Sequence, residues 1–165
     1  PDPTTFFNKV DVVLTSNPTQ ITPRIIVTGE IPRTNTIEDA GGAFFLDPET
    51  TTPDPIVDDQ SLIIDGTNTY ILITGCCHSG IVNTLNHITK NILSKKKKVI
   101  IIGGLHLHQA NSERLIFTAQ HLNEYPINAL YPVHCTGFNA VKFLVHHLPI
   151  DILPAPAGTI LQFTI

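Results

Sequence analysis

The second half of the sequence alternates short β-type runs with segments of helical periodicity, and this alternation restricts the fold more than any other feature. The β-type runs are Tyr70–Thr74, Val99–Ile102 and Ala129–Val133. In the segments that follow them, apolar residues recur three and four positions apart, which predicts helices with one apolar face. Strands joined by helical crossovers run parallel. The sequence therefore predicts an α/β architecture with a parallel or mixed sheet covered by helices.

The alternation predicts three helices. The first places Ile81, Leu85, Ile88 and Ile92 on one face, with Ser79 as its N-cap. The second begins at about residue 112, and the third covers residues 138–148. Two closing strands are expected at the end of the chain, over residues 150–153 and 159–165.

The first sixty residues are rich in Thr and Pro, which predicts strands and long loops. Strands are expected over residues 10–14 and 25–28, and an exposed loop over residues 47–59. Two β-type runs flank Asp65-Gly66, a dipeptide that favours a hairpin between residues 61–64 and 70–74.

Charge and hydropathy exclude several classes of protein. The formal net charge is −4, and without a basic face the chain is not expected to bind nucleic acid. No apolar run reaches the roughly 18 residues that a membrane helix needs. Three cysteines, two of them adjacent, make a poor disulfide framework, so a reducing, cytoplasmic location is expected. With 165 residues and 42% hydrophobic residues, the chain is expected to form one domain, residues 1–165.

Each of the three β-type runs ends in a segment that carries His or Cys. Cys76-Cys77-His78 follows the first run, His106 and His108 follow the second, and His134-Cys135 follows the third. The carboxyl ends of parallel strands meet at one edge of a sheet, where open α/β sheets bind ligands. Imidazoles and thiols are both ligands of Zn²⁺. The sequence therefore predicts a metal site at this edge.

Each residue also has a plainer interpretation. His78 and His134 are equally consistent with metal ligands and with ordinary polar residues of the loops. His106 and His108 share one side of an extended segment, and His106 is the better candidate for the site. The three cysteines are also consistent with small buried apolar residues. The other histidines are expected on helix surfaces or in packing contacts: His87, His121, His146 and His147.

Five blocks of sequence between residues 29 and 137 resemble, in the same order, the metallo-β-lactamase superfamily. More narrowly, they resemble the branch of the dihydropterin-methyl-ribofuranosylaminobenzene-phosphate synthase. The blocks are Gly29-Glu30-Ile31-Pro32-Arg33, Asp58-Asp59-Gln60-Ser61-Leu62, residues 74–83 (TGCCHSGIVN), Ile102-Gly103-Gly104-Leu105-His106-Leu107 and Tyr131-Pro132-Val133-His134-Cys135-Thr136-Gly137. The resemblance implies an αββα sandwich with a metal site, usually of two zinc ions, at one edge of the sheets.

The resemblance also assigns roles to residues. His78 and His134 would be metal ligands, and His106 would act at the metal site as a ligand, as a neighbour of the ligands or as a substrate-binding group. It implies metal-assisted hydrolysis or hydrolytic transfer on a small, phosphorylated or pterin-like substrate, with two zinc ions in the complete protein.

The HxHxDH signature of the superfamily has no counterpart in these 165 residues. We therefore expect the chain to be the C-terminal part of the fold, with an incomplete metal site. We also expect an apolar sheet face that another polypeptide buries. Only 15% of the residues are charged, against roughly 25% in soluble domains, as expected for such a part. The partner expected on this face is the missing N-terminal half or a second copy of the chain.

Two other functions stay open on the sequence. The chain is also consistent with a non-catalytic domain that keeps half of the fold for association. A cysteine-dependent enzyme that uses Cys135 is the third hypothesis, and it would be sensitive to thiol alkylation but independent of chelators.

Overall fold

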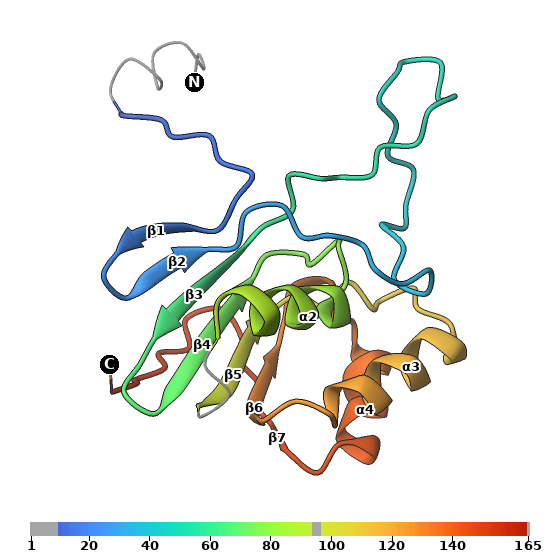
Figure 1. Cartoon of the computed structure of the whole chain (residues 1–165). Coiled ribbons are helices and arrows are strands. Elements are labelled where there is room, and N and C mark those ends of the chain that lie inside the picture. Colours follow the sequence, from blue (N-terminus) through green and yellow to red (C-terminus); the bar gives the residue numbers. More distant parts are fainter. Residues whose placement is uncertain (1–9, 94–96, 165) are drawn as a thin grey trace.

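The β-type runs of the sequence form one mixed sheet with three helices on one of its faces (Figure 1). The computed structural model describes residues 10–93 and 97–164. Within these residues the sheet has seven strands, which lie side by side in chain order. The elements are β1 (Thr19–Thr22), β2 (Ile25–Val27), β3 (Ser61–Asp65), β4 (Thr69–Thr74), α2 (Ile81–Asn91), β5 (Lys98–Gly103), α3 (Ser112–Leu122), β6 (Ile127–Pro132), the short 3₁₀ helix η1 (His134–Thr136), α4 (Phe138–His147) and β7 (Asp151–Ile152).

The direction of the strands changes in the middle of the sheet. Strands β1 to β4 pair antiparallel, and β4 to β7 pair parallel through the helical crossovers. The β3–β4 hairpin turns at Asp65-Gly66, where the Gly66 N–H donates to the Thr69 carbonyl. The predicted α/β fold with a mixed sheet and covering helices is confirmed.

The core lies between the sheet and the helices. In α2, Ile81, Leu85 and Ile88 are fully buried, as the spacing of apolar residues predicts. They pack in one cluster with alternate residues of the central strands and with α4: Ile63, Leu72, Ile101, Leu130 and Leu144.

The face of the sheet opposite the helices is apolar as well. Its side chains alternate with those of the core, and the central ones, Ile71 and Ile100, are buried. The remaining apolar residues of this face are half-buried: Leu62, Ile64, Ile73, Ile102 and Tyr131. A sheet that is apolar on both faces is typical of strands covered on both sides.

Three local expectations are wrong. Residues 10–14 form no strand, because the Pro23-Arg24 turn pairs residues 19–22 with β2 instead. Residues 159–164 form no closing strand; Pro154 and Pro156, just before them, lack the N–H groups that a ladder needs, and residue 165 lies outside the described residues. Ser79 does not cap α2, because Gly80 is the N-cap residue.

The long connection between β2 and β3 crosses the carboxyl ends of the parallel strands and the start of α2 (Figure 1). Its residues 47–59 form the mostly exposed loop that the sequence predicts. None of the helices within the described residues has the length and hydropathy of a membrane span.

Candidate metal centre

The loops that follow β4, β5 and β6 are joined by backbone hydrogen bonds. The Gly104 N–H donates to the Gly75 carbonyl over 2.9 Å, and the Val133 N–H donates to the Gly103 carbonyl over 3.0 Å. The N–H groups of Leu107 and His108 donate to the Cys135 carbonyl over 3.1 and 3.0 Å. The three loops therefore form one continuous rim at the carboxyl edge of the parallel strands, as the topology predicts.

Gly104 lets the loops approach this closely. A Cβ atom at this position would lie 2.6 Å from the Gly75 oxygen and 2.7 Å from the Cys135 sulfur. Neither distance is compatible with an ordinary side chain, so the rim needs a glycine here for close approach.

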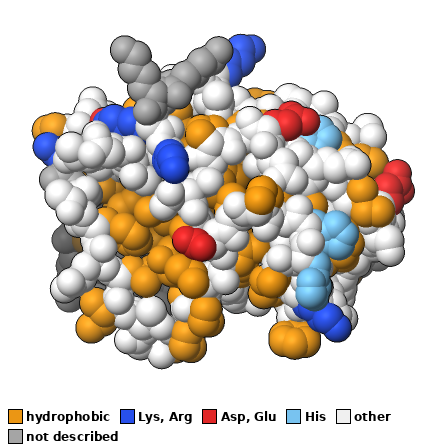
Figure 2. Space-filling view, turned by 90° about the horizontal axis from the view of Figure 1, so that it is seen from below, with side chains coloured by type: hydrophobic (Ala, Val, Ile, Leu, Met, Phe, Trp, Pro, Cys, Tyr) orange, Lys and Arg blue, Asp and Glu red, His pale blue; other side chains and the backbone are white. Residues whose placement is uncertain are grey.

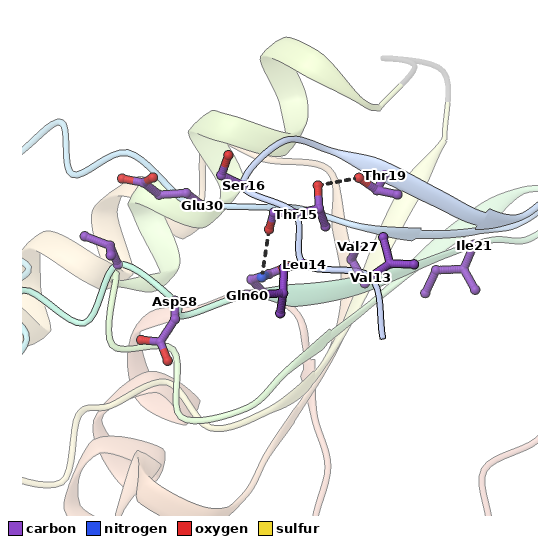
Figure 3. A pocket seen from close by; sticks show the side chains of 11 residues that line it. Val13, Leu14, Thr15, Ser16, Thr19, Ile21, Val27, Glu30, Asp58 and Gln60 are labelled. Atoms are coloured by element: carbon purple, nitrogen blue, oxygen red, sulfur yellow. Dashed lines mark hydrogen bonds between the residues drawn. The ribbon is translucent and has the colours of Figure 1, made fainter. Parts of the chain in front are cut away.

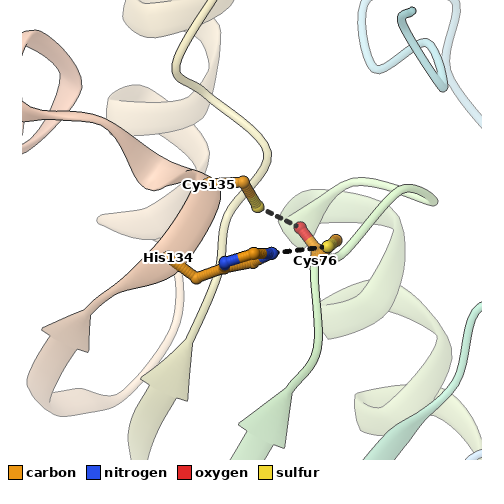
Figure 4. A group of neighbouring side chains, drawn as sticks. All are labelled: Cys76, His134 and Cys135. Atoms are coloured by element: carbon orange, nitrogen blue, oxygen red, sulfur yellow. Dashed lines mark hydrogen bonds between the residues drawn. The ribbon is translucent and has the colours of Figure 1, made fainter. Parts of the chain in front are cut away.

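Cys76, His134 and Cys135 form a group of possible metal donors, shown in Figure 4. The Cys76 Sγ lies 3.0 Å from the His134 Nε2, and the Cys135 thiol donates to the Cys76 carbonyl over 3.1 Å. The three donor atoms all lie within 4.8 Å of one another. His134 is exposed and the two cysteines are half-buried, so the group is open to solvent.

His78 and His106 form a second group on the same rim. Their ring centroids are 4.4 Å apart, and the ring of His108 lies 5.8 Å from that of His106. The His78 Nδ1 lies 3.4 Å from the Ala40 carbonyl oxygen. The two groups lie on loops that are bonded to one another, since Cys76 and His78 share the turn after β4 and the N–H groups of Leu107 and His108 donate to Cys135. The structure places His134 with the cysteines and His78 with His106, so within the described residues the two predicted ligands belong to different groups.

Three residues of the rim have a left-handed backbone although they are not glycine. Their φ angles are 63° for Cys77, 50° for His106 and 50° for His134, one in each of the three loops. Such a conformation costs of order 1–3 kcal/mol per residue and is common at functional sites. The surrounding hydrogen bonds hold these residues in strained conformations, which supports a functional role for this edge.

The long β2–β3 connection holds the start of α2 and the turn before it. Glu38 is 2% exposed, and its carboxylate accepts hydrogen bonds from the Val82 and Asn83 N–H groups, each over 2.8 Å. Arg33 donates to the His78 carbonyl over 2.6 Å, and Asp59 accepts from the Ser79 N–H over 2.8 Å. Arg33 and Asp59 stand in two of the five sequence blocks, but the sequence assigns them no role. Glu38 was missed altogether, because the N–H groups of α2 are satisfied by a carboxylate more than forty residues away rather than by a neighbouring cap.

Burial shifts several pKa values in the site. Desolvation, and next the neighbouring His78, lower the pKa of His106, so its neutral imidazole is favoured. Desolvation is also the main reason why the pKa of Cys135 is raised, with the neighbouring Cys76 adding to it. The pKa of the fully buried Cys77 is raised far above its ordinary value by desolvation. Cys77 is part of the apolar core, as its plainer interpretation predicts.

The remaining histidines lie in the helices, and three of them lie near backbone carbonyl oxygens. His121 and His147 lie near the carbonyl oxygens of Phe117 and Phe143, four residues earlier, and His87 lies near the Thr28 carbonyl oxygen. The expectation that these residues have ordinary packing roles is confirmed.

The donor group around Cys76 fits a metal ion by its chemistry. Zinc accepts thiolate sulfur and imidazole nitrogen, and the donor atoms of a tetrahedral zinc site lie about 3.5–4 Å apart. Three donors within 4.8 Å of one another fit one such ion after small side-chain movements.

Comparisons with known proteins give two curated relatives, both from Methanocaldococcus jannaschii. The 7,8-dihydropterin-6-methyl-4-(beta-D-ribofuranosyl)-aminobenzene-5'-phosphate synthase is 30% identical over 155 residues, which are 92% of this chain and 52% of the relative. The uncharacterized protein MJ0448 is 35% identical over 136 residues, which are 82% of this chain and 49% of the relative. The chain thus spans about half the length of the curated relatives that it matches. No protein-family model matches the chain.

A solved structure has the same fold. It is a metal-dependent hydrolase of the β-lactamase superfamily, with a TM-score of 0.81 and 26% sequence identity. The match covers 94% of this chain and 59% of that chain. The resemblance to the metallo-β-lactamase superfamily, and to the branch of the dihydropterin-related synthase, is confirmed.

Proposed function

We propose that this chain, which has the fold and the sequence motifs of the metallo-β-lactamase superfamily, supplies the C-terminal half of a zinc-dependent hydrolase site. His78 and His134 would be metal ligands, and a polypeptide segment with the HxHxDH signature would supply the others. The observation that carries the proposal is that the loops bearing the His78–His106 pair and the Cys76–His134–Cys135 group are hydrogen-bonded into one rim.

The environment of His78 suits a ligand. Its Nδ1 lies near the Ala40 carbonyl oxygen, and a proton on Nδ1 leaves Nε2 unprotonated and free to bind a cation. The Arg33 guanidinium holds the His78 backbone through its carbonyl oxygen. These two contacts orient the imidazole before a metal ion is bound.

Cys76 and Cys135 lie beside His134 and would supply further donor atoms to the same ion. Either sulfur is a donor that zinc accepts, and the His134 ring is already within hydrogen-bonding distance of Cys76. Zinc bound at such a site provides Lewis acidity, which lowers the pKa of coordinated water to about 7 and polarises the substrate.

His106 would contact the substrate. Since burial lowers its pKa, the ring is neutral near pH 7 and offers one donor and one acceptor nitrogen. Its ring lies beside that of His78, so a group held by His106 is next to the metal ligand.

The reaction we propose is hydrolysis or hydrolytic transfer on a small, phosphorylated or pterin-like molecule. Two observations support it: the neighbour of known structure is a metal-dependent hydrolase, and the curated relative is a synthase whose name contains a dihydropterin and a 5'-phosphate. A cytoplasmic location goes with this proposal.

The proposed partner covers the apolar face of the sheet opposite the helices. Figure 2, which shows the molecule from below relative to Figure 1, has hydrophobic side chains gathered on the left of this side. An apolar hollow of about 710 Å³ lies beside β1 and β2, where Leu14 is 92% and Val13 is 77% exposed (Figure 3). The N-terminal half of the αββα fold is the occupant we propose for the sheet face, and a second copy of the chain is the other candidate.

The alternative function is a non-catalytic association domain, which the exposed apolar residues beside β1 and β2 favour. The experiment that separates the two adds a polypeptide with the HxHxDH half to this chain and follows hydrolysis of a chromogenic phosphodiester. We expect activity only in the mixture, its loss in His78→Ala and His134→Ala, and its retention in the surface control His146→Ala. A stable complex without zinc-dependent hydrolysis of any phosphorylated or pterin ester would favour the association domain.

A further inference from the structure

Arg114 is a buried cation with an incomplete set of partners. It lies in the first turn of α3 and is 7% exposed. Its Nη1 donates to the Asp39 carboxylate over 2.7 Å and to the Asp39 carbonyl over 3.2 Å. Its Nε and Nη2 are buried and have no hydrogen-bond partner among the described residues. Buried N–H groups of a charged side chain are costly to leave unpaired, so an acceptor is missing here.

A second residue with a buried, unpaired atom lines the same small cavity as Arg114. Arg114 and His106 both line a cavity of about 180 Å³, together with Asp39, Gly41 and His108. The Nδ1 of His106 is buried and, within the part of the chain that the structure describes, also has no partner. A water molecule takes about 30 Å³ of the liquid, so this space is sufficient for a phosphate group or several waters.

We propose that Arg114 binds a phosphate group of the substrate in this cavity, beside His106. Guanidinium presents its N–H groups as a planar fork that matches the oxygens of phosphate, and the unpaired Nε and Nη2 are one edge of that fork. The proposal rests on the proposed function in one respect, namely that the bound molecule is the substrate of the metal site. It adds that Arg114 selects a substrate with a phosphate group.

The position of the cavity fits a substrate-binding role. His106 lines the cavity, and its ring centroid is also 4.4 Å from that of His78 on the rim. A phosphate held at Arg114 would therefore place the rest of the molecule beside the proposed metal ligands.

Asp39 marks where an anionic oxygen binds the guanidinium. Its side chain is 75% exposed, whereas that of Arg114 is 9% exposed, so the carboxylate can turn to solvent while the cation stays in place. Arg114 Nε and Nη2 are buried in this arrangement, so in our proposal the Asp39 side chain moves before phosphate reaches them. Asp39 binds Nη1 rather than the Nε–Nη2 edge, so it leaves that edge free, and its negative charge weakens the binding of phosphate there.

The test is a titration of the metal-free chain with inorganic phosphate, followed by NMR amide shifts and calorimetry. We expect Arg114→Lys to weaken phosphate binding roughly tenfold or more, since the fork is lost while the charge stays. Asp39→Asn keeps an oxygen for Nη1 but removes the negative charge, so it should bind phosphate more tightly than the unchanged chain. Arg24→Lys, on the exposed turn between β1 and β2, is the matched control and should leave binding unchanged.

Two results would overturn the proposal. One is equal phosphate affinity in the unchanged chain, Arg114→Lys and Asp39→Asn. The other is phosphate binding that needs added zinc and is insensitive to Arg114→Lys, which would assign the anion to the metal and leave the proposed function standing. Phosphate binding that depends on Arg114 in a chain that takes up no zinc would support the inference and contradict the proposed function. Because Arg114 is buried, circular dichroism of the Lys variant verifies its fold, and Asp39→Asn provides a test that does not depend on that variant.

Discussion

The Sγ of Cys76 lies 3.0 Å from the Nε2 of His134, although 58 positions separate the two residues in the sequence. One residue follows β4 and the other follows β6, two strands that lie on either side of β5. The contact shows that the parallel topology brings distant donor groups to one rim. It also places two of the three thiols that the sequence offers as candidate donors beside His134.

The three thiols should differ sharply in reactivity. Cys77 is 1% exposed and burial raises its pKa far above its ordinary value, so iodoacetamide at pH 8 should leave it unmodified in the native chain. Cys76 and Cys135 are half-buried and should react, Cys135 more slowly because burial raises its pKa as well, and added zinc should protect both. Peptide mass spectrometry measures each site, with the denatured chain as the control in which all three react. Native modification of Cys77, or an absence of zinc protection, would contradict this picture of the site.

Replacement of Glu38 by Gln should destabilise the chain. The carboxylate accepts from two N–H groups at the start of α2, where a negative charge is favourable, and the amide keeps only one good acceptor. We expect a loss of about 1–3 kcal/mol in the free energy of unfolding, measured by urea denaturation. The matched control is Glu49→Gln on the exposed loop, which should change stability by less than about 0.5 kcal/mol. Equal stabilities of the two variants would rule out the capping role.

Substitution of Gly104 tests the close approach of the three loops. A Cβ atom at Gly104 would overlap with Cys135 and Gly75, so Gly104→Ala should cost about 1–3 kcal/mol of stability and weaken zinc binding. Gly75→Ala is the matched control on the same rim, since a Cβ atom there would meet no atom within 4 Å. Thermal unfolding and zinc titration of both variants measure the difference. Zinc affinity and stability that are unchanged in Gly104→Ala would show that the rim is less tightly packed than described.

Asp47 gives a prediction for acid pH. Its pKa is lowered to about 2, chiefly by the hydrogen bond from the Thr51 backbone N–H. Since the pKa is lower in the folded than in the unfolded chain, the loop contacts of Asp47 should be complete above about pH 4 and be lost as the pH falls through about 2. NMR amide shifts of Thr51 and Thr52 should report this midpoint, and Asp47→Asn should abolish the transition. A midpoint near 3.8, the ordinary value, would show that the loop does not hold the carboxylate.

The sequence predicts the central part of the fold because local and tertiary preferences agree there. The spacing of Ile81, Leu85 and Ile88 gives α2, and the Asp65-Gly66 turn gives the β3–β4 hairpin. Parallel crossovers then require the loops with His78, His106 and His134 to share one edge. The edges of the sheet are harder to predict, since residues 10–14 have β-type composition but no neighbouring strand to pair with.

The parts of the site that the sequence does not reveal are long-range polar contacts. Glu38 and Arg33 lie in a loop without periodicity, and their partners at the start of α2 are more than forty residues away. Arg114 has the spacing of an ordinary helix residue, and only the structure shows that its guanidinium is buried beside His106. Such contacts depend on the path of a loop, which local patterns do not determine.

In the function that we propose, this chain provides part of a metal centre and another segment completes it. The most direct measurement is the zinc content at equilibrium dialysis of the chain alone and of its mixture with a polypeptide that has the HxHxDH half. We expect more zinc per chain in the mixture than in the separate components, and a loss of this excess in His78→Ala and His134→Ala. Zinc content that is the same in the mixture as in the separated components, and insensitive to both substitutions, would contradict the claim.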